Sequence, residues 1–203
     1  IYVRNKRLAC EKVGIKSLAY DLPSSTSEAE LLTLIKQLNE DKTVDGILVQ
    51  SPLPAHIKDE HIIEQISPDK DVDGFHPVNV GKMVLGVEGF VPATPLGIML
   101  LLAHYNINTT GLHAVVIGRS NIVGRPMSIL LSAEHPQGNC TVTCCHRYTP
   151  KEDLIDICSK ADIIVVAVGI PEFVDASMIK PGAVIIDVGI TRVTDPTAAK
   201  GFR

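Results

Sequence analysis

Four short apolar runs in the second half of the chain constrain the fold more than any other feature of the sequence. They are "AVVI" at 114–117, "TVTCC" at 141–145, "DIIVVAVG" at 162–169 and "AVIIDVG" at 183–189. Segments with helical spacing follow the first two runs, near 126–134 and from 150 onward. Strands that are apolar on both faces and alternate with helices are typical of a parallel sheet covered on both sides. We therefore predict an α/β protein whose second domain is a Rossmann-type parallel sheet.

The first half of the chain shows the same alternation. Helical spacing over 2–13 ends at Gly14, and a capping box formed by Ser27 and Glu30 opens a second predicted helix, "EAELLTLIKQLNED". The runs "KSLAYDL" and "GILVQ" predict strands. The pair Thr94-Pro95 predicts the start of the helix "LGIMLLLAHY", and Thr149-Pro150 that of the helix after 150. We expect two α/β domains, 1–92 and 93–203, with a cleft between them.

Composition excludes several classes of function. The net charge is −4 with acidic and basic residues interleaved, which argues against a nucleic-acid partner. The apolar runs are too short to span a membrane and no secretory signal is present, so we expect a cytoplasmic protein without a membrane partner. No ligand spacing predicts a metal site. The cysteines, without a C-x-x-C pair, are expected to be reduced; they are Cys10, Cys140, Cys144, Cys145 and Cys158.

The loop after the strand at 114–117 predicts a phosphate site. Gly118 and Gly124 flank a polar turn that opens a helix near Pro126, which presents free backbone N–H groups. The loop lacks the three glycines of the usual dinucleotide fingerprint. The next strand ends at Arg147 with no carboxylate, which favours NADP over NAD, and Arg119 can assist in binding the 2′-phosphate. A simpler interpretation is that Arg147 only caps a solvated strand end.

Three places in the first half carry candidate chemistry. Tyr2 and Lys6 lie four residues apart on one predicted helix face, and Gln50 ends a strand next to a proline-rich loop. Asp71 and Asp73 lie on a turn-rich loop. Each has a simpler interpretation, since a lysine beside a tyrosine is commonly a surface pair and such aspartates are commonly turn residues.

Seven motifs taken together resemble one enzyme family. In chain order they are "YVRNK", "GILVQSPLP", "PDKDVDGFHPVNVG", "PATPLGI", "VVIGRSNIVGRP", "CHRYT" and "IIDVGI". Their order and spacing are similar to those of the bifunctional methylenetetrahydrofolate dehydrogenase/methenyltetrahydrofolate cyclohydrolase family. The resemblance implies oxidation of 5,10-methylenetetrahydrofolate to the methenyl form with NADP, then hydrolysis to 10-formyltetrahydrofolate, in one-carbon metabolism and purine biosynthesis.

The resemblance also implies roles for individual residues. Lys6 matches the catalytic lysine that handles the proton in hydrolysis, and Gln50 the glutamine that orients its amine. Tyr2 matches the tyrosine that packs on the folate, and Asp73 the aspartate that bonds the pterin ring. The implied substrate site comprises Tyr2, Gln50, Ser51, Pro52, Leu53 and Asp73. The implied cofactor site comprises Thr94, Gly118, Arg119, Ser120, Val123, Gly124, His146, Arg147, Val168, Gly169, Gly189 and Ile190.

Further expectations follow from the family pattern. It implies a homodimer, and it predicts that the first domain is incomplete at its N-terminus and that a C-terminal return segment is missing. The motif "HRYTPKE" also resembles the mitochondrial branch of the family, which uses NAD with phosphate and magnesium and lies in the mitochondrial matrix. Two competing hypotheses are a two-domain dehydrogenase of the shikimate or amino-acid type and a non-catalytic module that binds a dinucleotide or folate.

Overall fold

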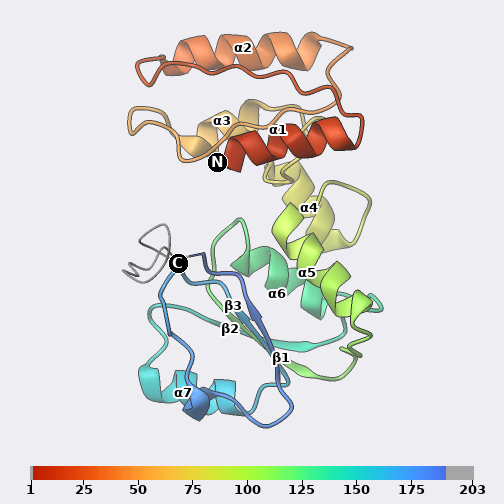
Figure 1. Ribbon diagram of the computed structural model, residues 1–203, viewed down its shortest axis with the longest axis vertical. Helices are drawn as coiled ribbons and strands as arrows, with labels where there is room; N and C mark the ends of the chain where they lie inside the picture. Colours follow the sequence, from red (N-terminus) through yellow and green to blue (C-terminus); the bar gives the residue numbers. More distant parts are fainter. Residues whose placement is uncertain (1, 191–203) are drawn as a thin grey trace.

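The computed structural model describes residues 2–190, apart from the side chain of Tyr2. Figure 1 shows a helical part that precedes a sheet-containing part, with α4 and α5 between them. The helices are α1 Tyr2–Lys12, α2 Glu28–Glu40, α3 Asp59–Gln65, α4 Pro77–Leu85, α5 Ala93–His104, α6 Gly124–Ser132 and α7 Lys151–Ser159, with a 3₁₀ helix η1 at Ala176–Met178. The strands are β1 His113–Ile117, β2 Thr141–Cys145, β3 Ile163–Val166 and β4 Val184–Asp187.

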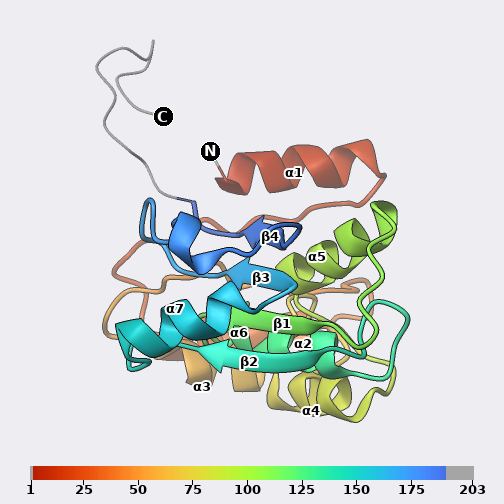
Figure 2. The ribbon, with the colours of Figure 1, turned by 90° about the horizontal axis from the view of Figure 1, so that it is seen from below.

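The sheet confirms the α/β prediction for the second half of the chain. Its four strands are parallel in the order β2-β1-β3-β4, as Figure 2 shows across the sheet. Alternate residues of β1 face opposite sides, so Ala114 and Val116 pack with α5 and α6 while Val115 and Ile117 pack with α7. Helices cover both faces (Figure 1), which explains why β1 and β3 are apolar at almost every position.

The strand register brings several loops to one edge of the sheet. Ile117 at the end of β1 is level with Cys145 of β2 and with Val166 of β3, and Val166 is in turn level with Asp187 of β4. All four strands therefore end together. In open α/β sheets, ligands bind beyond this carboxyl edge.

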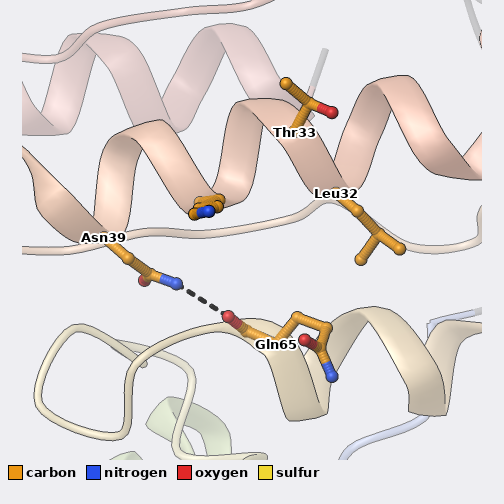
Figure 3. A pocket seen from close by; sticks show the side chains of 5 residues that line it. Leu32, Thr33, Asn39 and Gln65 are labelled. Atoms are coloured by element: carbon orange, nitrogen blue, oxygen red, sulfur yellow. Dashed lines mark hydrogen bonds between the residues drawn. The ribbon is translucent and has the colours of Figure 1, made fainter.

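The helical part has its own small core between α2 and α3. Leu31 and Ile35 of α2 pack against Ile62 and Ile66, with Ile47 beside them. Figure 3 shows a shallow groove at the side of this contact, where the amide of Asn39 donates to the carbonyl of Gln65 at 2.7 Å. The bond joins the end of α2 to the end of α3.

The ammonium group of Lys70 binds the C-terminal end of α2. Its Nζ donates to the carbonyl oxygens of Leu38, Asn39 and Asp41 at 2.7–2.9 Å. A cation at a helix C-terminus satisfies carbonyls that have no intrahelical partner. The loop that begins at Lys70 is therefore anchored to α2.

The strands predicted in the first half are wrong. Residues 16–22 form no strand, and residues 46–50 contribute only an isolated parallel bridge between Ile47 and Asp71. A strand needs a hydrogen-bonded neighbour, and the described part of the chain offers these segments none apart from that bridge. Leu18 and Tyr20 are accordingly exposed.

The predicted helix ends are correct in two places. Ser27 and Glu30 form the reciprocal capping box of α2, and Gly14 follows α1 with φ at +78°.

The remaining predicted helix starts need correction. Proline is the N-cap of α5 and of α7, so Thr94 lies inside the first turn of α5 and Thr149 lies before its helix. The hydroxyl of Thr149 instead accepts the backbone N–H of His146 at 2.9 Å. Helix α6 begins at Gly124, two residues before the expected Pro126. Among the described residues, no helix combines the length and apolar character needed to cross a bilayer.

Candidate active site

Lys6 and Gln50 meet although they lie far apart in sequence. Nζ of Lys6, on α1, donates to Oε1 of Gln50 at 3.1 Å. The amide nitrogen of Gln50 donates to the carbonyl of Ser51 at 2.9 Å, which fixes the orientation of the amide with its oxygen toward the amine. The peptide bond between Ser51 and Pro52 is cis. The structure thus places an oriented amide against a half-buried lysine.

Asp73 completes a polar group around this lysine. Its side chain is partly buried, and burial raises the pKa of the Asp73 carboxyl above its ordinary value. The charge of Lys6 lowers this pKa and the carboxylate of Asp71 raises it, with burial the dominant cause. The three predicted side chains Lys6, Gln50 and Asp73 therefore share one site. Tyr2 lies on the same helix, but its side chain lies outside the described residues.

The raised pKa of Asp73 gives a testable pH dependence. A carboxyl whose pKa is higher in the folded protein than in the unfolded chain lowers stability as the pH rises from the unfolded value toward the folded value. This penalty is complete once the pH lies above the folded pKa, and it disappears below the unfolded pKa. Asp73→Asn removes the buried charge, so we expect a Tm at pH 7 equal to or above that of the wild type. The difference in Tm should shrink as the pH falls into the acidic range.

Thermal unfolding followed by circular dichroism from pH 3 to pH 8 measures this effect. The matched control is Asp69→Asn, because Asp69 is exposed on the same loop. A lower Tm for Asp73→Asn at pH 7, with no change for the control, would contradict the claim that the buried charge of Asp73 destabilises the fold.

The remaining residues predicted for the substrate site follow Gln50 directly. Ser51 and Pro52 are exposed, whereas Leu53 is partly buried and packs against the core between α2 and α3. Leu53 therefore anchors the loop that carries Gln50 to the helical core.

Asp71, which the sequence named beside Asp73 as candidate chemistry, is a structural residue. Its side chain is 2% exposed, and its carboxylate accepts the N–H groups of Phe75 and His76 and the amide of Asn79 at 2.8–3.3 Å. Its backbone also forms the bridge to Ile47. Asp71 thus ties the loop of Asp73 to the segment that leads to Gln50. Its partners come from the segment that leads into α4, and no spacing in the sequence marked this role.

The loop after β1 requires its two glycines for packing. Gly118 has φ at +125°, and a Cβ there would lie 2.6 Å from the carbonyl oxygen of Ala167. A Cβ on Gly124 would overlap the carbonyl oxygen of Gly118. The hydroxyl of Ser120 accepts the backbone N–H groups of Val123 and Gly124 at 3.2 and 3.4 Å. The predicted residues Gly118, Ser120, Val123 and Gly124 therefore form one tight turn against β3.

Two further predicted glycines lie at the same edge of the sheet. Among residues 2–190, a Cβ on Gly169 would meet no atom within 4 Å. A Cβ on Gly189 would lie 2.6 Å from the carbonyl oxygen of Val168. Val168 and Gly189 line an open cavity of about 350 Å³ beyond β3 and β4. Thr94 is exposed on α5, and Ile190 is 98% exposed at the end of the described chain.

The predicted arginines lie at the ends of β1 and β2. Arg119 follows β1, Arg147 follows β2, and both guanidinium groups lie near the ring of Tyr148, a residue outside the predicted set. His146 is half-buried and its Nδ1 lies 3.3 Å from the backbone N–H of Tyr148. The motif "HRYT" shows Tyr148 directly after Arg147. That Tyr148 also lies near Arg119 depends on the strand register and could not be read from the motif.

Neither a disulfide nor a metal-binding cluster is found among the described residues. All five cysteines are unpaired, and burial raises the pKa of the Cys158 thiol to about 11. Within residues 2–190, no group of three or more His, Cys, Asp or Glu side chains is arranged to hold a metal ion.

Sequence profiles of two domains match the chain. The profile of the tetrahydrofolate dehydrogenase/cyclohydrolase catalytic domain matches residues 1–73, and that of the NAD(P)-binding domain matches residues 92–201. A curated relative from Porphyromonas gingivalis, the bifunctional protein FolD, is 52% identical over 202 residues, which is 100% of this chain and 68% of that protein.

Solved structures give the same result. The chain is similar to the bifunctional methylenetetrahydrofolate dehydrogenase/cyclohydrolase FolD from Campylobacter jejuni, with a TM-score of 0.90 and 49% identity over 98% of this chain and 67% of that one. It is also similar to the Trypanosoma brucei enzyme solved with NADP cofactor and an inhibitor, with a TM-score of 0.90 and 38% identity over 100% of this chain and 67% of that one.

Proposed function

Because the chain belongs to the tetrahydrofolate dehydrogenase/cyclohydrolase family, we propose that it catalyses both reactions of that family. The first oxidises 5,10-methylenetetrahydrofolate to the methenyl form with NADP, and the second hydrolyses the product to 10-formyltetrahydrofolate. The observation that carries this proposal is the contact between Lys6 and Gln50, with Asp73 close enough for its carboxyl to respond to the lysine charge. A non-catalytic binding module has no need for an amine oriented in this way.

The polar group around Lys6 can perform the hydrolysis. Water adds its oxygen to the methenyl carbon and gives one proton to Nζ of Lys6, which takes it up as the neutral amine. Lys6 returns that proton to N5 of the folate, the bond between N5 and the carbon breaks, and the remaining hydroxyl proton leaves as the formyl carbonyl forms. Gln50 holds Nζ in place through its amide oxygen. Asp73 binds the polar edge of the pterin and Tyr2 packs on the folate, as the family resemblance implies.

The residues at the sheet edge fit a dinucleotide. The turn from Gly118 to Gly124 packs tightly on β3 and leads into α6. The N–H groups of Val123, Gly124 and Arg125 donate to Ser120, so the free N–H groups expected at this helix start are not observed. When bound, NADP supplies the acceptor for the hydride that leaves the folate methylene carbon. We propose that Arg119 and Arg147 bind its 2′-phosphate and that the sheet edge holds the rest of the molecule through Thr94, Ser120, Val123, His146, Val168, Gly169, Gly189 and Ile190. The NADP bound to the Trypanosoma brucei relative supports this choice over NAD.

Several further assignments are carried over from the family. We propose a division into a folate domain at 1–92 and a cofactor domain at 93–203, which places the boundary at the start of α5. A homodimer and a role in purine biosynthesis follow from the same resemblance, and we also propose a cytoplasmic location.

Gly169 provides a test of the cofactor site that does not disturb the fold. Its Cβ would meet no atom of the described part of the chain within 4 Å, so Gly169→Ala is expected to keep the wild-type Tm. If NADP occupies that space, the added methyl group should weaken NADP binding about tenfold, which corresponds to about 1.4 kcal/mol. Isothermal titration calorimetry gives the Kd.

The control for this variant is Gly97→Ala, which also adds a Cβ into open space but on helix α5. It should leave the Kd for NADP unchanged. Equal NADP affinity for Gly169→Ala and the wild type would remove Gly169 from the cofactor site.

Turnover with defined cofactors tests the proposed function as a whole. Methenyltetrahydrofolate formation is followed by its absorbance with NADP, with NAD, and with NAD plus magnesium and phosphate. Turnover with NADP alone is the expected result. Turnover only with NAD would place the chain with the NAD-dependent branch, and no turnover under any condition would contradict the dehydrogenase assignment.

A further inference from the structure

One exposed aromatic ring connects the two predicted phosphate-binding arginines. The Cζ atom of Arg147 lies 4.8 Å from the centroid of the Tyr148 ring, and Cζ of Arg119 lies 5.7 Å from the same centroid. Both distances are within the range of a cation–π interaction. The two arginines come from loops after different strands, so the ring of Tyr148 is one of the contacts between these loops.

The backbone that carries Tyr148 is itself fixed. His146 and Thr149 form a reciprocal pair, in which the N–H of His146 donates to the Thr149 hydroxyl at 2.9 Å and the N–H of Thr149 donates to the carbonyl of His146 at 2.8 Å. Such a turn holds the two residues between its ends in place. Arg147 and Tyr148 are those two residues, and both side chains are exposed.

The charges at this place are unbalanced. Among residues 2–190, no carboxylate forms an ion pair with Arg119 or Arg147. Two guanidinium groups on one ring repel each other, and the electron-rich face of the ring offsets part of that repulsion. A phosphate dianion would offset the rest, since guanidinium groups bind phosphate oxygens in a fixed planar geometry.

We propose that Tyr148 is a positioning residue that holds the guanidinium groups of Arg119 and Arg147 ready for one phosphate dianion, and so sets the preference for NADP over NAD. This inference rests on the proposed function, because it assigns the dianion to the 2′-phosphate of the cofactor. A free phosphate ion bound beside NAD has the same chemistry, and the experiment separates the two sources.

The test compares Tyr148→Ala with Tyr148→Phe, which keeps the ring and removes only the hydroxyl. The Kd values for NADP, for NAD, and for NAD in the presence of inorganic phosphate are measured by titration calorimetry. Loss of two exposed cation–π contacts should weaken NADP binding by about five- to thirtyfold in Tyr148→Ala. Tyr148→Phe should stay within about twofold of the wild type, because the face of the ring is retained. The affinity for NAD alone should not change in either variant.

Tyr105→Ala is the matched control, because Tyr105 is as exposed as Tyr148, at 67% against 66%, and its ring lies against His104. It should change no Kd value. A merely structural role for Tyr148 would move the Kd values for NADP and NAD together, so an unchanged NADP/NAD ratio in Tyr148→Ala overturns the inference, as does a Phe variant that is as weak as Ala.

The result for the wild type separates this inference from the cofactor assignment. If the wild type prefers NADP and Tyr148→Ala keeps that preference, only the role of Tyr148 is wrong. If the wild type binds NAD better with inorganic phosphate and Tyr148→Ala loses that response, the dianion is free phosphate and the choice of NADP is wrong. A wild type that shows neither preference overturns both.

Discussion

Replacement of Lys6 by methionine is expected to lower the rate of methenyltetrahydrofolate hydrolysis by about three orders of magnitude, within the range of general acid–base catalysis. Methionine keeps most of the length of the side chain but cannot take up or release a proton. The amide oxygen of Gln50 then loses the donor that it meets at 3.1 Å. The Kd for the folate should change much less than kcat, because Asp73 and the loop after Gln50 are retained.

The same helix offers a control for Lys6. Lys12 is exposed at the end of α1, and Lys12→Met removes the same charge outside the site. It should hydrolyse the methenyl compound at the wild-type rate. Stopped-flow absorbance of the methenyl form gives the rates, after correction for spontaneous hydrolysis. Hydrolysis by Lys6→Met within tenfold of the wild type would mean that another group moves the proton.

Replacement of Asp71 by alanine is expected to destabilise the protein by about 3 kcal/mol, because buried donors that lose a charged acceptor carry a penalty of about 1–3 kcal/mol each. The N–H groups of Phe75 and His76 and the amide of Asn79 all donate to this carboxylate, which is 2% exposed. The amide oxygen of Asn79 is already buried without a hydrogen-bond partner among the described residues. Urea unfolding followed by circular dichroism measures the loss.

Two variants on the same loop control for this effect. Asp71→Asn keeps one acceptor oxygen and should lose less stability than Asp71→Ala, and Asp69→Ala, at an exposed position, should change stability by less than about 0.5 kcal/mol. A loss below about 1 kcal/mol for Asp71→Ala would show that water replaces the carboxylate and that Asp71 does not hold the loop of Asp73.

The sheet could be predicted from sequence because its signal is local. Strands β1 and β3 are short apolar runs buried on both faces, whereas β2 contains two threonines and β4 is only partly buried. The same reasoning failed for 16–22 and 46–50, where apolar residues are present but the described chain provides no neighbouring strand. Apolar character favours a strand, whereas the strand itself depends on hydrogen bonds to another segment.

Helix starts show the limit of local signals in another way. Ser27 and Glu30 form their capping box within four residues, so the pattern was sufficient. The hydroxyl of Thr149 could accept an N–H group either from the following helix or from the turn at His146. In the structure it accepts the N–H of His146, and Pro150 is the N-cap of α7 with no side-chain capping bond.

The candidate site divides along the same line. Lys6, Gln50 and Asp73 could be named from motifs, since each motif is a continuous stretch of sequence. The roles of Asp71 and Tyr148 depend on contacts between separate segments: the bridge from Asp71 to Ile47, and the register that sets Arg119 beside the turn after β2. Spacing along the chain does not contain that information.

The most direct test of the central claim is to supply the chain with 5,10-methylenetetrahydrofolate and NADP and to record NADPH and 10-formyltetrahydrofolate in the same sample. The wild type should form both products together. If Lys6→Met still forms NADPH, it should accumulate the methenyl compound and hydrolyse it no faster than the spontaneous rate. A wild type that forms no NADPH, or a Lys6→Met variant that releases 10-formyltetrahydrofolate as fast as the wild type, would contradict the proposed function.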